Sequence, residues 1–344
     1  MRVGITYDLR ADYLARGFSE EDTAEFDSEI TVAAIGGALE SLGHIAERIG
    51  DVQRLAVRLA AGDRWDCVFN FCEGLKGVAR EAQVPALLEA YDVPYVFSDP
   101  LTLCVALDKG MAKRILRDCG VPTAPFAVIL EPKDIAAIAL PYPLFLKPVA
   151  EGSGKGIGAQ SKVANRQELE TVSADLLKRF EQPVLVEQFL CGREFTVGIT
   201  GTANDAEVLG VMEVLFTESA APHGYGYENK EHFEGRMDYR LVDDSEAREA
   251  AEVALAAWRA LRCRDGGRID IRSDAHGKPH FIEVNPLAGL NHERSDLCFI
   301  ARFKGVTYPD LIGRIMESFS RRHPLAAAAV HLKHARSRSA LRRR

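Results

Sequence analysis

The stretch RIDIRSDAHGKPHFIEVNP, residues 268–286, decides the fold. Two segments of alternating polar and apolar residues flank the turn DAHGK, which predicts two neighbouring strands. Alternation places Arg268 and Asp270 on one face of the first strand, and Glu283 and Asn285 share a face of the second. If the strands pair, two carboxylates and an amide oxygen converge. Hard oxygen donors of this kind suit Mg²⁺ or Mn²⁺.

The alternative for these residues is a solvated strand face held by arginine–aspartate pairs across the strands. The flanking residues are apolar and the acids lie in mid-strand, which favours the metal site.

A glycine-rich loop, EGSGKGIGAQ at residues 151–160, follows the apolar strand LFLKP at 144–148. Its glycines let backbone N–H groups close around an anion, although a flexible hairpin explains them equally well. Lys147 lies on the strand just before the loop, and burial of a lysine is costly unless an anion partners it. A lysine reaching solvent from an edge strand is the alternative. With the carboxylates, these elements predict an ATP site between two α+β blocks.

The first hundred residues alternate between strand and helix patterns, which predicts a parallel sheet with helices on its faces. We expect a long polar loop over Arg10–Ser28 and a single helix over Leu101–Cys119. Later blocks mix helices with antiparallel hairpins, so the fold class is α/β and α+β. The expected units are an N-terminal domain (1–100), a central domain (101–188), a C-terminal domain with the metal site (189–322) and a basic, disordered tail (323–344).

Composition narrows the function classes. The chain has 344 residues and a net charge of −7, and six Lys or Arg fall in its last 14 residues, so the remainder carries −13. An acidic body argues against nucleic-acid binding over the main fold, although the basic tail could touch a polyanion. No apolar run is long enough to span a membrane. Seven scattered cysteines fit free thiols in a reducing cytoplasm better than disulfides or structural zinc.

Four motifs occur in order: KPxxEGSxxG from residue 147, VxVEQFLxGxEFTVGI from 184, GRIDxRxD from 267 and FIEVNPxxGL from 281. The chain thereby resembles the ATP-grasp superfamily, and within it the D-alanine–D-alanine ligases, over roughly residues 60–320. The resemblance implies a Rossmann-like N-terminal domain and two α+β subdomains that enclose ATP. It also implies small amino-acid substrates and a homodimer formed through the first domain.

The resemblance also implies roles for individual residues. The nucleotide contacts are Lys109 and Lys147 at the phosphates, Glu151, Gly152, Ser153, Gly154 and Gly156 in the loop over them, Glu187, Phe189 and Leu190 at adenine, and Glu194 at ribose. Asp270, Glu283 and Asn285 would hold two Mg²⁺ or Mn²⁺ ions. Arg268 and the N–H of Gly289 would form an oxyanion hole, and Lys230 would close over the phosphates from the loop 223–236.

Several positions depart from the family pattern at the amino-acid end. The family's N-terminal serine/glutamate signature has no recognisable counterpart in TYDLRADY. Glu73 stands where a histidine is expected, and Glu231 replaces a tyrosine. Arg294, with Ser295 beside it, stands where a substrate-binding serine is usual. Because the ATP residues are retained, these differences indicate ligase chemistry with an altered substrate.

The expected activity is therefore an ATP-dependent, ADP-forming carboxylate–amine ligase that works through an acyl phosphate. D-Alanine is the first substrate to consider. A different amino acid or a peptide amine is the alternative, because Glu73 and Glu231 add negative charge near the amino-acid pocket. A nucleotide-binding protein of this fold without ligase activity is the second alternative.

Overall fold

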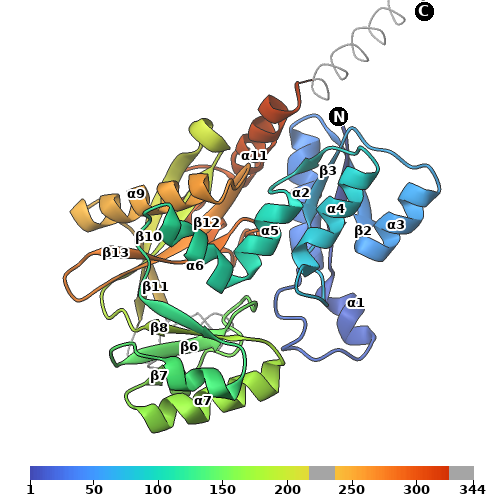
Figure 1. The fold of residues 1–344 in the computed structure, drawn as a ribbon. Coiled ribbons are helices and arrows are strands. Elements are labelled where there is room, and N and C mark those ends of the chain that lie inside the picture. The colour runs from blue at the N-terminus through green and yellow to red at the C-terminus, as the bar shows by residue number, and fades with distance from the viewer. Residues whose placement is uncertain (217–236, 325–344) are drawn as a thin grey trace, which may run out of the picture.

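The computed structural model describes residues 1–216 and 237–324, which form three sheets (Figure 1). The N-terminal sheet is parallel, with strand order β2-β1-β3-β4. Its strands are β1 (Arg2–Tyr7), β2 (Ile45–Gly50), β3 (Cys67–Phe71) and β4 (Tyr95–Val96), and its helices are α1 (Arg10–Ala15), α2 (Glu29–Ser41), α3 (Val52–Ala60) and α4 (Gln83–Ala90). The predicted parallel sheet is therefore confirmed.

The central sheet is antiparallel, with strand order β5-β8-β6-β7, and the helix α7 (Arg166–Phe180) packs on it (Figure 1). Its strands are β5 (Phe126–Ile129), β6 (Leu144–Pro148), β7 (Lys162–Val163) and β8 (Val184–Gln188). The glycine-rich loop leaves this sheet at the end of β6.

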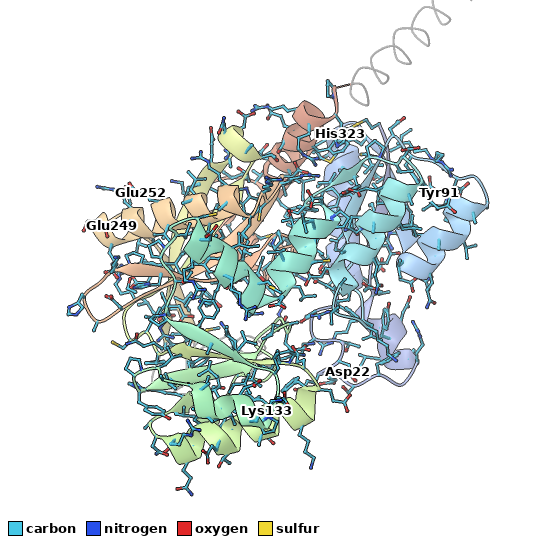
Figure 2. All side chains as sticks on the ribbon, in the orientation of Figure 1. Asp22, Tyr91, Lys133, Glu249, Glu252 and His323 are labelled. Atoms are coloured by element: carbon cyan, nitrogen blue, oxygen red, sulfur yellow. The ribbon has the colours of Figure 1, made fainter. Side chains whose placement is uncertain are left out.

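The C-terminal sheet is also antiparallel, with strand order β11-β10-β9-β12-β13. Its strands are β9 (Glu194–Thr200), β10 (Glu207–Phe216), β11 (Met237–Leu241), β12 (Gly266–Ser273) and β13 (Pro279–Asn285). On one face lies α9 (Ser245–Ala260), whose buried side is mostly alanine and therefore approaches the strands closely. Glu249 and Glu252 point from α9 to solvent (Figure 2). On the other face lies α10 (Asp296–Phe303), followed by α11 (Tyr308–Arg322).

One hydrophobic core joins the N-terminal sheet to α10 and α11, which fixes the first domain against the third. A buried ion pair within the third domain lies beside this contact: Arg322 Nη2 is 2.5 Å from Asp265 Oδ2, and Asp265 is 0% exposed. Asp265 also accepts a 2.8 Å hydrogen bond from the N–H of Phe97, just after β4. The cleft between the domains is thus built on a rigid base.

Two expectations about local structure are wrong. Leu101–Cys119 is not one helix but two, α5 (Pro100–Leu107) and α6 (Lys109–Asp118), because Asp108 turns the chain and its side chain caps α6 at the N–H of Met111. The segment Arg10–Ser28 is not entirely loop, since it begins with α1.

Other expectations fall on residues that the structure does not describe. The loop 223–236 and most of the basic tail lie outside the described residues. No helix within residues 1–216 and 237–324 is long and apolar enough to cross a membrane.

Candidate active site

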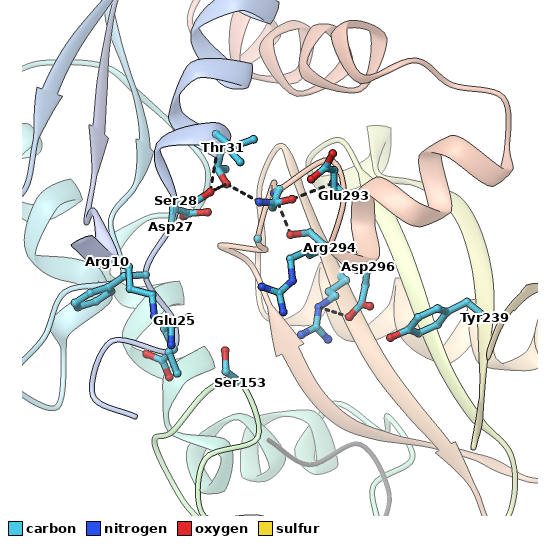
Figure 3. Close-up of a pocket in the computed structure, with 17 residues that line it drawn as sticks. Arg10, Glu25, Asp27, Ser28, Thr31, Ser153, Tyr239, Glu293, Arg294 and Asp296 are labelled. Carbon is cyan, nitrogen blue, oxygen red and sulfur yellow. Dashed lines mark hydrogen bonds and ion pairs between the residues drawn. The ribbon is translucent and has the colours of Figure 1, made fainter. Parts of the chain in front are cut away.

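Three cavities lie where the sheets meet. One of about 70 Å³ lies between β8, β12 and β13. One of about 120 Å³ lies between the end of β13, the glycine-rich loop and the N-terminal domain. The third, of about 390 Å³, is shown in Figure 3, where Arg10, Glu25 and Asp27 of the N-terminal domain face Arg294 and Asp296 beyond β13. Arg268 and Gly289 line both larger cavities, so the two share a boundary at the end of β13.

The smallest cavity brings together the residues expected to contact the nucleotide's base and ribose. Phe145, Ile157, Phe189, Leu190 and Ile282 give it an apolar slot. Its polar lining includes Lys147, Glu187 and Glu194 together with the metal candidates Asp270 and Glu283. An apolar slot next to a charged end is the shape that a nucleotide requires, with its base in the slot and its phosphates at the charged residues.

A buried triad of charges lies behind this cavity. Lys113 Nζ is 2.9 Å and Lys147 Nζ 3.3 Å from the Glu187 carboxylate, and all three residues are buried. Burial opposes ionisation of Glu187, but the two ammonium groups hold its pKa below the ordinary value. Burial lowers the pKa of Lys113, whereas for Lys147 the nearby Glu187 and Glu283 outweigh burial and raise it.

Sequence reasoning missed Lys113. It lies four residues after Lys109 on α6, and this spacing puts the two lysines on one helix face. The spacing was therefore the available signal.

The metal candidates converge as the strand pattern predicted. Strands β12 and β13 pair in antiparallel register, with Asp270 opposite Glu283 and Arg268 opposite Asn285. The intervening Ile269 and Ile271 are 0% exposed on the other face, which confirms the predicted alternation. Asp270 accepts a 3.0 Å hydrogen bond from Thr196 on β9.

The donor set fits a hard cation, because it consists of carboxylate and amide oxygens. Lys109 Nζ lies 3.5 Å from Glu283 and donates to the carbonyl of Glu151 at 2.6 Å. Within residues 1–216 and 237–324 no three His, Cys, Asp or Glu side chains cluster as a metal site. The third metal candidate, Asn285, carries an amide and is not one of these residue types.

The two oxyanion candidates lie at the edge of the larger cavities. Arg268 is held in place by Asp270, with which it forms a close ion pair, and by Asp296, whose Oδ2 is 3.4 Å from Nε. A Cβ at Gly289 would lie 2.8 Å from Ser295 Oγ, so a side chain at this position would displace that hydroxyl. The tight approach brings the Gly289 backbone and the Ser295 hydroxyl to the wall of the same cavity.

Glu25 is a further site residue that sequence reasoning did not identify. It accepts a 2.6 Å hydrogen bond from the N–H of Gly152 in the glycine-rich loop. Arg80 lies 3.0 Å and Lys155 3.4 Å from its carboxylate. Burial opposes its ionisation, but these two cations hold the pKa of Glu25 below its ordinary value. The only local signal was its position three residues before Ser28, the residue that caps α2.

The other residues of the glycine-rich loop form ion pairs, line the middle cavity or have backbone angles typical of glycine. Lys155 also pairs within the loop with Glu151 at 2.5 Å, and Glu151 accepts a 2.7 Å hydrogen bond from Gln182 of the central domain. Gly152 and Ser153 line the middle cavity, and Gly154 and Gly156 have positive φ angles of 73° and 75° that glycine adopts without strain.

Glu73 and Glu81 line the middle cavity, and Arg80 is the cation whose charge acts most on them. Neither carboxylate forms a hydrogen bond or ion pair with a described residue, whereas the other acids of this cavity, Glu25, Glu151 and Glu283, each have a basic partner. Burial, followed by the charges of Glu81 and Glu25, raises the pKa of Glu73 well above its ordinary value. Burial raises the pKa of Glu81 to about 7. The cavity therefore contains two carboxyl groups that have no ion-pair partner among the described residues.

The substrate candidates lie in different places. Arg294 and Ser295 line the largest cavity, and Glu73 lines the middle one. Lys230 and Glu231 lie outside the described residues.

Comparison with known proteins agrees with this geometry. A family model described as "D-ala D-ala ligase C-terminus" matches residues 115–317. The D-alanine–D-alanine ligase of Aquifex aeolicus is 33% identical over 288 residues, which cover 83% of this chain and 93% of that protein. The corresponding ligase of Bordetella petrii is 34% identical over 300 residues, which cover 86% of each chain.

Solved structures share the fold. The D-alanine–D-alanine ligase of Bacillus anthracis complexed with ATP matches with a TM-score of 0.69 and 20% identity, covering 93% of this chain and 98% of that one. The VanG D-Ala:D-Ser ligase of Enterococcus faecalis gives a TM-score of 0.69 at 18% identity, covering 92% and 99%. The expected ATP-grasp fold is thereby confirmed. From the family model and the identities above 30%, the chain belongs to the D-alanine–D-alanine ligase family of ATP-grasp enzymes.

Proposed function

We propose that this protein joins two amino acids, or an amino acid and a related amine, and that its carboxylate substrate carries a positively charged group. The activity class follows from the family: the protein is an ATP-dependent, ADP-forming carboxylate–amine ligase. One observation carries the rest of the proposal. Arg268 and Gly289 form a shared wall between the acidic middle cavity, which also contains Glu283 and Asn285, and the largest cavity.

ATP would occupy the smallest cavity, with its base against Phe189 and Leu190 and its phosphates toward Lys147 and the glycine-rich loop. We propose that Asp270, Glu283 and Asn285 hold magnesium. The ions would neutralise negative charge on the phosphates as the phosphoryl group is transferred.

The reaction requires two displacements. An oxygen of the substrate carboxylate attacks the γ-phosphorus, the bond to the β-phosphate oxygen breaks, and ADP leaves an acyl phosphate. The amine nitrogen then attacks the acyl carbon, and phosphate departs with that oxygen while the amine loses a proton. Arg268 and the N–H of Gly289 lie at the wall where the tetrahedral oxyanion would form, and donors of this kind are typically worth about 3–4 kcal/mol each.

The carboxyl groups of the middle cavity support the cationic substrate, because a nearby ammonium group favours their ionised form. An ammonium group placed between Glu73 and Glu81 would compensate the two carboxylates that have no described basic partner. D-Alanine supplies one such group, and a diamino acid supplies two. Glu25 is less suited to this role, because Arg80 and Lys155 already neutralise it. The cavity therefore favours substrates at least as basic as alanine and disfavours acidic ones.

The test is amine-dependent phosphate release from ATP with a panel of D- and L-amino acids and diamino acids, with products identified by mass spectrometry. We expect alanine or a diamino acid to be used as the carboxylate substrate and aspartate or glutamate to be rejected. The variant Glu73→Gln should lose preference for the cationic substrate, whereas Glu89→Gln, which pairs with Tyr95 far from the cavity, should not.

Preferential use of an acidic substrate would contradict the proposal. Thermal stabilisation by ATP without ADP formation from any substrate pair would favour the alternative, a binding protein without ligase activity. The homodimer inferred from the resemblance stays a prediction, which light scattering can test.

A further inference from the structure

The smallest cavity, where we place the nucleotide, is also lined by an arginine that has been given no role above. Arg272 lies on β12, two residues after Asp270, so its side chain shares the face that carries the metal candidates. In the sheet it stands directly opposite Glu194 of β9. Both side chains line the smallest cavity. The register of β9 and β12 therefore places this guanidinium beside the carboxylate expected at the ribose.

Two contacts hold Arg272 in position. Its Nη1 lies 3.1 Å from Glu194 Oε2, with the side chains 20% and 14% exposed. The guanidinium carbon lies 5.1 Å from the centroid of the Phe189 ring, which lines the slot for the base. The guanidinium is thus fixed between the base end and the ribose end of the cavity.

Arg272 also retains an unused donor. Its Nε is buried and has no hydrogen-bond partner among the described residues. A buried donor without a partner is costly unless another group satisfies it, and a polar ligand in this cavity would supply an acceptor. A carboxylate such as Glu194 has acceptor sites for a guanidinium and for ribose hydroxyls at the same time.

We propose that Arg272 is a positioning residue of the nucleotide site: it holds Glu194 so that this carboxylate accepts a ribose hydroxyl, and it thereby sets a preference for ribonucleotides over deoxyribonucleotides. The inference rests on the proposed place of ATP in this cavity. It adds a residue and a selectivity that the ligase assignment does not contain.

The chain supplies a matched control. Arg193 also pairs with carboxylates, among them Glu213 at 2.7 Å, and also lies over a phenylalanine ring, Phe195, at 4.8 Å. It lines none of the three cavities. An effect of losing an arginine–carboxylate pair on stability would appear in both variants, whereas an effect on ribose selectivity would appear only in the Arg272 variant.

The experiment is calorimetric titration of the full-length protein with Mg·ATP, 2′-deoxy-ATP and 3′-deoxy-ATP, without amino acids. The wild type should bind ATP about tenfold more tightly than at least one deoxy analogue. Arg272→Met should weaken ATP binding about tenfold and leave binding of that analogue unchanged, so the preference disappears. Arg272→Lys should restore part of the preference, and Arg193→Met should keep it in full.

The outcomes separate this inference from the function on which it rests. A wild type that binds ATP and both analogues equally, or an Arg272→Met variant that keeps the preference, would overturn the inference alone. A wild type that binds no nucleotide would overturn the nucleotide site and the inference with it. The measurement needs no turnover, so failure to find the amino-acid substrates would not affect it.

Discussion

Replacing Glu187 with glutamine should destabilise the protein strongly, because this carboxylate neutralises two buried lysines. Lys113 and Lys147 lie 2.9 and 3.3 Å from it, and their side chains are 0% and 4% exposed. Removing one partner of a buried ion pair typically costs about 3–5 kcal/mol, because the remaining charge is left without compensation. We expect Glu187→Gln to lower the free energy of unfolding by that amount. Urea denaturation followed by circular dichroism at pH 7.5 measures it.

The double variant Lys113→Met/Glu187→Gln makes the test specific to charge. It removes one ammonium group together with the carboxylate, so the destabilisation should be smaller than in Glu187→Gln alone. A purely steric cost of the glutamine would instead add to the cost of losing Lys113. An additive double variant, or a Glu187→Gln protein within 0.5 kcal/mol of the wild type, would refute the electrostatic reasoning.

Three further perturbations test other parts of the structure. Asp270→Asn and Glu283→Gln should each reduce amine-dependent phosphate release to about one hundredth or less without loss of fold, and normal rates in both would contradict the metal assignment. Burial raises the pKa of Asp27 to about 7, so the folded state keeps its proton up to that pH while the unfolded state loses it near 3.8. The free energy of unfolding should therefore fall between pH 4 and 7, by at most about 4 kcal/mol, and urea midpoints should show a flatter pH profile for Asp27→Asn. Asp265→Asn should cost about 3–5 kcal/mol because its partner on α11 is left charged at a buried site, whereas the exposed Asp205→Asn should cost less than 1 kcal/mol in the same assay.

The sequence contained enough information for the strand pair that carries the metal candidates. A period of two fixes which side chains share a face, and the short turn between Ser273 and Pro279 leaves antiparallel pairing as the simple arrangement. The observed opposition of Asp270 and Glu283 follows from these local rules. Each of the four motifs likewise covers at most two consecutive strands and the adjoining loop, so their identity did not depend on the tertiary structure.

The parts that were missed depend on contacts between distant segments. Glu25 reaches Gly152 across 127 residues, and Lys113 reaches the carbonyl of Phe281 across 168. No periodicity links such positions, because the packing of whole domains brings them together. The break between α5 and α6 was missed for a different reason: no proline interrupts residues 101–119, and the capping contact of Asp108 is what ends the first helix.

The distribution of the cavity residues explains how such an enzyme can change substrate while keeping its chemistry. Every residue that lines the nucleotide cavity lies after residue 144. The acids of the middle cavity that are not metal candidates include Glu25, Glu73 and Glu81, all from the N-terminal domain. Substitutions at Glu73 or Glu81 would therefore alter the charge at the proposed amino-acid site without touching the glycine-rich loop, whereas Glu25 is bonded to that loop. The shared core with α10 and α11 holds the N-terminal domain against the third domain, so Arg268 and Gly289 would keep their place at the cavity wall when the N-terminal acids change.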